Sequence, residues 1–191
     1  MNELYTEGLG FRAGTANQAS KTVLEGKVRV LPRQPLPPHD AASFLNGEYQ
    51  TYETLEPLVF YRVYGCGYSG AGAGPKGRFV TTEYAESKID VKLRLALKLE
   101  WKNTRMVEAR LLIPAGTVIQ VGVVAPQTLP TGTVLPGGAD QIMLPAGWPD
   151  EWITGYRLLH FHPQLTYPEY SPEEPPAQMP KPRREENASE V

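Results

Sequence analysis

Polar residues that could bind a ligand stand at the ends of several apolar, strand-like segments of this chain. Arg62 lies within residues 58–64, Arg78 and Thr81 lie within residues 77–82, and Gln141 follows two glycines. An arginine inside an apolar strand must be paired or must face a cleft, because an unpaired buried guanidinium is costly. Its fork of N–H donors suits a pyrophosphate. The order Arg, Thr, Gln along successive strand ends therefore suggests a nucleotide pocket.

A purely structural role is open to each of these residues as well. Arg62 could form an internal ion pair with a carboxylate such as Glu83 or Asp140. The buried amide of Gln141 could be satisfied by a backbone partner without any function. Arg78 could be an ordinary surface residue.

Other familiar chemistries lack their parts in this sequence. His160 and His162 form a spaced pair, but no Cys or carboxylate nearby completes a zinc pattern, so we expect no metal site. Residues 70–78 lack the Gly-Lys-Ser/Thr ending of a phosphate loop and lead into a strand, which favours a flexible lid. Cys66 has no adjacent histidine and there is no Gly-x-Ser-x-Gly elbow, which disfavours nucleophilic acyl chemistry.

Composition limits the class of protein. The 191 residues are 41% hydrophobic, enough for one domain with a packed core and tails. No apolar run approaches 18 residues and no signal peptide is evident, so we expect a soluble chain without a membrane span. Cys66 is the one cysteine, which favours a reducing compartment over an oxidising one. The formal net charge of −2 gives no general attraction to nucleic acid.

Strands are the elements that must position the candidate site. Segments rich in β-branched and aromatic residues predict a largely antiparallel sheet. Residues 114–116, Pro-Ala-Gly, predict a hairpin between the two strands on either side of them. The predicted strands are residues 27–31, 58–64, 107–113, 117–124 and 141–144. The expected fold class is α+β, with a mainly antiparallel twisted β-sheet core and one or two short helices.

Residues 83–103 fit two periods. Their apolar residues alternate as in a strand, and a subset also forms one helical stripe. The first half is rich in Leu, Lys, Ala and Glu, which favours a helix with Thr82 or Ser87 as its N-cap.

Three regions are expected along the chain. Residues 1–57 predict a partly ordered N-terminal leader or linker, because prolines 32, 35, 37 and 38 favour an extended backbone. Residues 58–162 predict the domain that holds the pocket. Residues 163–191 alternate proline with charged residues and predict a flexible tail.

The order of short motifs resembles the NAD-glycohydrolase toxin domains of interbacterial systems, including the tuberculosis necrotizing toxin group. More distantly it is similar to the ADP-ribosyltransferase scaffold. The resemblance covers about residues 58–148, and the order of the motifs carries it. The motifs are residues 61–65, 77–82, 95–97, 101–103, 113–117, 122–127 and 137–142.

This resemblance implies roles for individual residues. Arg62 would clamp the diphosphate and Arg78 is a second phosphate candidate. Thr81 and Tyr64 would position ribose and nicotinamide, and Phe79 is a further residue of the binding site. Gln141 matches a glutamine of the toxin group where transferases usually have glutamate. A glutamine can hydrogen-bond the ribose as positive charge develops, but it cannot take a proton from a nucleophile. The resemblance thus implies hydrolysis by water, with Gln141 and Arg62 as the central residues.

Three functions follow as hypotheses. The first is an NAD(P)+ glycohydrolase toxin that a secretion system delivers into the cytoplasm of a target cell and that a cognate immunity protein neutralises. It takes NAD or NADP as substrate and needs no cofactor. The second is a mono-ADP-ribosyltransferase, for which Asp140 would supply the carboxylate, although alternation in a strand predicts that it faces away from Gln141. The third is a non-catalytic β-rich binding module.

Overall fold

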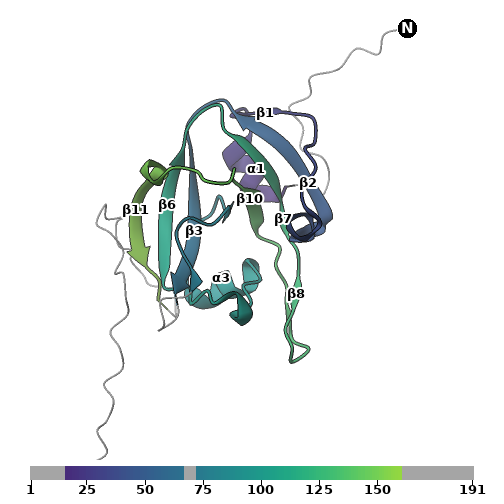
Figure 1. Cartoon of the computed structure of the whole chain (residues 1–191), viewed down its shortest axis with the longest axis vertical. Helices are drawn as coiled ribbons and strands as arrows, with labels where there is room; N and C mark the ends of the chain where they lie inside the picture. Colours follow the sequence, from purple (N-terminus) through teal and green to yellow (C-terminus); the bar gives the residue numbers. More distant parts are fainter. Residues whose placement is uncertain (1–15, 67–71, 161–191) are drawn as a thin grey trace, which may run out of the picture.

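Two antiparallel β-sheets stand next to each other, with short helices at their ends (Figure 1). The structure is a computed structural model that describes residues 16–66 and 72–160. The larger sheet has the strand order β1-β2-β7-β10-β5, the smaller has the order β11-β6-β3-β4, and β8 and β9 form a separate ribbon. The predicted α+β class with a mainly antiparallel β core is confirmed.

The bounds of the elements are as follows. The larger sheet contains β1 (Val28–Val30), β2 (Phe44–Thr54), β5 (Phe79–Val80), β7 (Val118–Val124) and β10 (Asp140–Met143). The smaller sheet contains β3 (Leu58–Cys66), β4 (Gly72–Ala73), β6 (Val107–Ile113) and β11 (Ile153–Leu158), and the ribbon contains β8 (Gln127–Thr128) and β9 (Val134–Leu135). The helices are α1 (Gln18–Leu24), α2 (Pro38–Ala41) and α3 (Lys88–Arg94), with short 3-10 turns η1 (Leu99–Trp101) and η2 (Asp150–Trp152).

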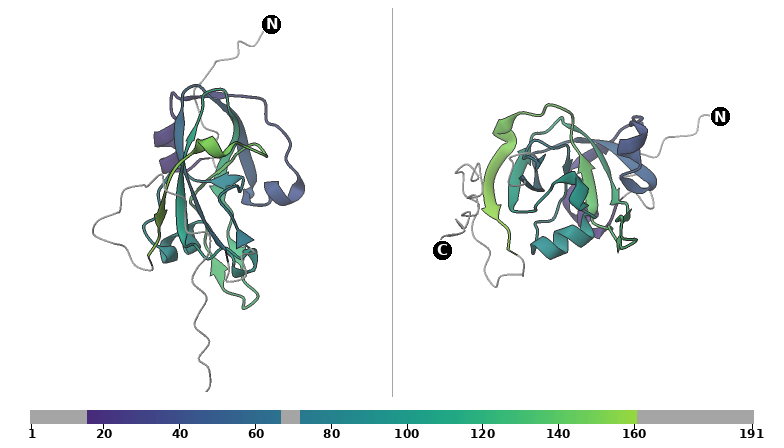
Figure 2. Two further views of the ribbon diagram at one scale, coloured as in Figure 1. Left: turned by 60° about the vertical axis from the view of Figure 1, so that its left-hand side comes forward. Right: turned by 60° about the horizontal axis from the view of Figure 1, so that its bottom comes forward.

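The two sheets are joined by the backbones of Tyr61 in β3 and Thr81, which directly follows β5. The Tyr61 N–H donates to the Thr81 carbonyl at 2.8 Å, and the Thr81 N–H donates to the Tyr61 carbonyl at 2.9 Å. Apolar side chains from both sheets form the main core, and Phe60, Leu111 and Ile142 are fully buried there. Helix α3 lies at one end of the gap between the sheets (Figures 1 and 2).

Strands β6 and β7 occur where predicted, but the prediction that they form a hairpin is wrong. β6 pairs with β3 and β11, whereas β7 pairs with β2 and β10, so residues 114–116 carry the chain from one sheet to the other. Thr54, at the end of β2, holds this corner. Its hydroxyl donates to the Pro114 carbonyl at 2.8 Å and accepts the Thr117 N–H at 2.9 Å.

The first half of the ambiguous segment 83–103 contains a helix, α3, as its composition predicts, although residues 83–87 are not helical. The side chain of Ser87 accepts the Asp90 N–H at 3.1 Å and caps α3. The helix ends at Arg94, and Ala96 has a positive φ of 47° that no helix tolerates. The one-turn η1 follows before the chain enters β6.

Much of the segment predicted as a leader forms regular structure. Its residues 1–15 lie outside the described part of the chain, but Phe44–Thr54 forms β2, which lies between β1 and β7. The register of β2 shifts between Phe44 and Tyr49, and Asn46 and Gly47 have positive φ within that shift. This irregularity interrupts the alternation of apolar and polar residues that identifies a strand in a sequence.

Residues 163–191, the predicted tail, lie outside the described residues. In the part of the chain that the structure covers, none of the helices has the length and apolar character to cross a bilayer.

The start of β10 is positioned by α3 and β7. The carbonyls of Leu93 and Arg94, at the C-terminal end of α3, accept the N–H groups of Gly137 at 3.0 Å and Ala139 at 3.2 Å. Gly137 has a φ of 68°, and a Cβ atom at this position would lie 2.6 Å from the Val124 carbonyl oxygen. Only glycine meets both demands, so this contact fixes where β10 begins.

We therefore expect Gly137→Ala to destabilise the protein by roughly 2–4 kcal/mol, because it adds a steric overlap with backbone to the cost of a left-handed conformation. Gly138→Ala is the matched control. Gly138 also has a positive φ, of 90°, but a Cβ there meets nothing within 4 Å, so it should cost about 1–2 kcal/mol. Chemical denaturation measures both, and equal losses would contradict the steric argument.

Candidate functional site

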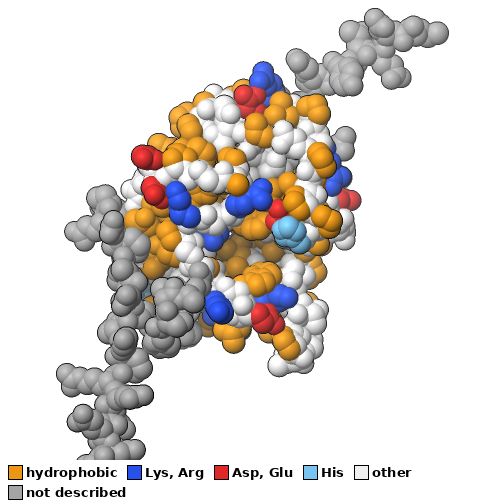
Figure 3. Space-filling view, in the orientation of Figure 1, with side chains coloured by type: hydrophobic (Ala, Val, Ile, Leu, Met, Phe, Trp, Pro, Cys, Tyr) orange, Lys and Arg blue, Asp and Glu red, His pale blue; other side chains and the backbone are white. Residues whose placement is uncertain are grey.

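A cavity of about 450 Å³ opens between the two sheets. This volume lies within the range of small-molecule sites, and most of the surface is apolar, as such sites require. In the space-filling view it is seen as a hollow with hydrophobic side chains inside and basic side chains near its rim (Figure 3).

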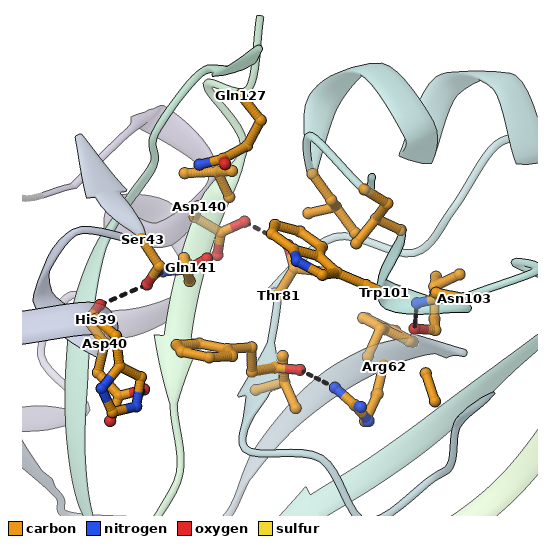
Figure 4. A pocket seen from close by; sticks show the side chains of 18 residues that line it. His39, Asp40, Ser43, Arg62, Thr81, Trp101, Asn103, Gln127, Asp140 and Gln141 are labelled. Atoms are coloured by element: carbon orange, nitrogen blue, oxygen red, sulfur yellow. Dashed lines mark hydrogen bonds and ion pairs between the residues drawn. The ribbon is translucent and has the colours of Figure 1, made fainter. Parts of the chain in front are cut away.

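Four of the six residues singled out in the sequence line this cavity: Arg62, Phe79, Thr81 and Gln141. They come from β3, β5, the residue after β5, and β10. Gln141, Ser43 and Asp140 lie on one side of the cavity, and Arg62 and Asn103 lie on the other (Figure 4). The structure thus brings residues of both sheets together at one cavity, although Arg62 lies in the middle of β3 and not at a strand end.

The other two residues lie elsewhere. Tyr64 is 6% exposed and belongs to the main core. Arg78 does not line the cavity; its Nε donates to the Leu144 carbonyl at 3.2 Å and its Nη1 pairs at 3.1 Å with the carboxylate of Asp40, which does line it.

Arg62 is held by backbone carbonyls rather than by Glu83 or Asp140. Its Nε donates to the Gly74 carbonyl at 3.1 Å and its Nη1 donates to the Phe79 carbonyl at 2.8 Å. Among the described residues no carboxylate pairs with it, and Nη2 makes no hydrogen bond. Burial lowers the pKa of Arg62 to about 10, so the guanidinium keeps its charge at neutral pH. A cation without a counter-ion at this position favours an anionic ligand.

The segment around Gly77 covers the guanidinium of Arg62. A Cβ atom on Gly77 would lie 1.7 Å from Nη2 of Arg62, so this glycine allows the close approach. Lys76 anchors the segment, since its Nζ donates to the Trp148 carbonyl at 2.9 Å and pairs with Asp150 at 2.8 Å. β4 (Gly72–Ala73), which belongs to the predicted lid of residues 70–78, pairs with β3, so this part of the lid is held to the sheet.

Gln141 is 8% exposed and faces Ser43 across the strands. Its Nε2 donates to the Ser43 hydroxyl at 2.8 Å, which is a side-chain partner rather than the backbone partner considered from sequence. No described residue donates a hydrogen bond to its Oε1.

Asp140 also lines the cavity, although it alternates with Gln141 along β10. It has no exposed surface, and burial raises the pKa of its carboxyl group. Hydrogen bonds oppose this rise: the Thr81 hydroxyl donates to Oδ1 at 2.5 Å and the Thr82 N–H donates to Oδ2 at 2.8 Å. The carboxylate is therefore held by neutral groups and not by a cation.

Several further residues that line the cavity were not among those singled out, and they include Ser43, Trp101 and Asn103. Ser43 lies in the predicted leader, and no sequence signal marked it. Trp101 is 48% exposed, with the ammonium of Lys98 at 5.4 Å from its ring centroid. Asn103 is buried, and its side chain donates to the Val63 carbonyl at 3.0 Å. Trp101 and Asn103 occur in one of the short motifs that carry the family resemblance.

Metal ligands do not gather in the described residues, where no group of three or more His, Cys, Asp or Glu side chains is placed to hold an ion. His160 is exposed and its carbonyl accepts the Lys88 N–H at 2.8 Å. His162, its partner in the spaced pair, lies outside the described residues.

The chain was compared with protein families, curated proteins and solved structures. No family model matches the chain, and no curated protein matches it. Among solved structures, the chain is similar to one described as "Structure of Tne2 in complex with Tni2", with 19% sequence identity and a TM-score of 0.49. The match covers 62% of this chain and 99% of that chain.

The raised pKa of Asp140 makes a prediction about stability. The folded protein keeps the Asp140 proton at pH values where the unfolded chain, with a pKa near 3.8, has lost it. The stability linked to this proton is present at low pH and is lost as the pH rises through the folded-state pKa.

We therefore expect the wild type to lose stability relative to Asp140→Asn as the pH rises above about 4. Unfolding by denaturant at a series of pH values measures the difference between the two proteins. A difference that does not change with pH would show that Asp140 titrates alike in both states.

Proposed function

We propose that this protein is an NAD(P)+ glycohydrolase, which hydrolyses the bond between nicotinamide and ribose. The observation that carries the proposal is the convergence of Arg62 of β3, Thr81 after β5 and Gln141 of β10 on one cavity between the sheets. The motif order that resembles the toxin domains predicts this convergence.

Arg62 supplies the anion-binding part of the proposed site. Its Nη2 is the guanidinium nitrogen that is not used for a backbone carbonyl, and it would donate to the diphosphate of the dinucleotide. Binding of an anion would also offset the cost of burying this guanidinium, which the lowered pKa reflects. The aromatic side chains of Phe79 and Trp101 provide apolar surface for the planar rings of the substrate.

Gln141 would act on the reacting ribose. Cleavage of the glycosidic bond passes through an oxocarbenium-like state, in which positive charge develops on the ribose. A fixed dipole costs no reorganisation as this charge appears, and the Gln141 amide is fixed by Ser43 at 2.8 Å. Thr81, held by Asp140, is a second oriented polar group on the cavity wall. Water would then attack the anomeric carbon.

Transfer to an acceptor is the alternative reaction, and it needs a carboxylate that can reach the incoming nucleophile. Asp140 has no exposed surface, and both of its oxygens accept hydrogen bonds from Thr81 and Thr82. This arrangement supports hydrolysis over transfer. A binding module without catalysis is the third alternative, and unlike the proposed hydrolase it would release no nicotinamide from NAD.

The biological setting belongs to the same proposal. We propose that the chain depletes NAD or NADP in the cytoplasm of a target cell after delivery by a secretion system, and that a cognate immunity protein blocks it. NAD(P)+ is the substrate in this proposal, and no separate cofactor is required.

The first test is the consumption of NAD and of NADP by the purified chain, with nicotinamide and ADP-ribose measured separately and no protein acceptor present. Release of both products in equal amounts is expected. Gln141→Ala should lower kcat by about 100-fold or more, because one preorganised dipole contributes about 3 kcal/mol in the transition state. No turnover by the wild type, or full turnover by a folded Gln141→Ala variant, would contradict the proposal.

The approach of Gly77 to Arg62 gives a second test. Gly77→Ala should move the guanidinium, since the new methyl group would occupy the space of Nη2. We expect a rise in KM of about tenfold, as for the loss of one charge-assisted hydrogen bond. A loss of stability should accompany it, because the bonds from Arg62 to the Gly74 and Phe79 carbonyls are disturbed. Gly74→Ala is the control, because a Cβ there meets nothing within 4 Å. Equal activity of the two variants would show that Arg62 does not bind the substrate.

A further inference from the structure

The hydroxyl of Ser43 has both of its hydrogen-bonding roles fixed by its neighbours. Its one hydrogen is donated to the Asp40 carbonyl at 2.6 Å, within the turn that links α2 to β2. Its oxygen lies 2.8 Å from the side-chain amide of Gln141. Because a hydroxyl carries a single hydrogen, Ser43 can only accept a hydrogen bond from Gln141.

This restriction sets the orientation of the Gln141 amide. The two ends of a glutamine amide have similar shapes but opposite roles, since the nitrogen donates and the oxygen accepts. An accepting Ser43 requires the Nε2 end, which leaves Oε1 as the end available to a ligand. At Gln141 the cavity therefore offers the ligand a hydrogen-bond acceptor, Oε1.

The hydroxyl of Thr81, which also lines the cavity, has its hydrogen committed in the same way. Its hydroxyl hydrogen is donated to Asp140 at 2.5 Å, so towards a ligand the Thr81 oxygen can only accept. Gln141 and Thr81 thus both offer hydrogen-bond acceptors to a ligand, because their donors already bind Ser43 and Asp140.

We propose that Ser43 is a positioning residue that turns Gln141 to present Oε1, and that the cavity thereby selects a ligand with hydroxyl donors at this point. In the site proposed above, on which this inference rests, those donors are the hydroxyls of the nicotinamide ribose. Ser43 acts through Gln141 and touches no substrate atom in this scheme.

The orientation is tested without any assay of activity. In ¹⁵N-labelled protein, the side-chain NH₂ pair of Gln141 is identified by its absence from the spectrum of Gln141→Glu. We expect this pair to be shifted from the position of free glutamine in the wild type and in Ser43→Thr, and to move to that position in Ser43→Ala. An unchanged NH₂ pair in folded Ser43→Ala would overturn the proposal, whether or not the protein hydrolyses NAD.

The consequence for the reaction is tested by a double-mutant cycle. A carboxylate has two equivalent acceptor oxygens and needs no partner to choose between them. Ser43→Ala should therefore lower kcat for NAD about tenfold in the wild-type background, as for the loss of one hydrogen bond, with KM nearly constant. In the Gln141→Glu background the same change should cost less than about twofold.

Equal losses in the two backgrounds, with normal stability, would overturn the role of Ser43 in orienting Gln141. Ser43→Thr, which keeps a hydroxyl, should retain most of the activity, and a loss as large as that of Ser43→Ala would also count against it. Failure of the proposed function is seen separately, as no NAD turnover by the wild type while the NH₂ pair still responds to Ser43.

Discussion

The backbone pairing between Tyr61 and Thr81 is the contact on which the site depends. It joins two sheets whose strands otherwise pair with different neighbours. Arg62 is the next residue after Tyr61, and Thr81 is itself part of the cavity wall. The bond from Nη1 of Arg62 to the Phe79 carbonyl adds a second link at the same place. A cation from one sheet and a hydroxyl from the other are therefore held next to each other by hydrogen bonds that join the two sheets.

Arg62 and Asp140, on the cavity wall, have partners of a different kind from those of a buried ion pair elsewhere in the protein. In the region between β6 and β11, Glu108 and Arg157 are both buried, and they form an ion pair, so each is compensated within the protein. In the cavity, Arg62 is held by carbonyls, and Asp140 is held by a hydroxyl and an N–H. Neutral partners satisfy hydrogen bonds but do not cancel charge. Arg62 therefore remains without an ion-pair partner among the described residues, which leaves its charge available to an anionic ligand.

The sequence predicted the strands and the helix whose apolar residues recur at a regular spacing, and it did not predict the segments in which that spacing is interrupted. Residues 58–64 and 107–113 are regular strands, and Ser87 caps a helix as its position indicates. β2 was missed because Asn46 and Gly47 interrupt its alternation. The hairpin prediction was wrong for another reason: residues 114–116 have the composition of a tight turn, but pairing partners from distant segments decide which strands meet. Local patterns specify elements well and specify their long-range neighbours poorly.

The same limit applies to the candidate site. Arg62, Thr81 and Gln141 could be selected from sequence because each is polar within an apolar segment, and the structure places all three on the cavity. Ser43 has no such signal, since a serine before an irregular strand is an ordinary turn residue. It reaches Gln141, 98 positions away, because β2 and β10 both pair with β7. Residues 58–162 taken alone would lack this partner of Gln141. The proposed site therefore depends on Ser43 and β2, which precede residue 58 in the chain, because pairing through β7 brings them to Gln141.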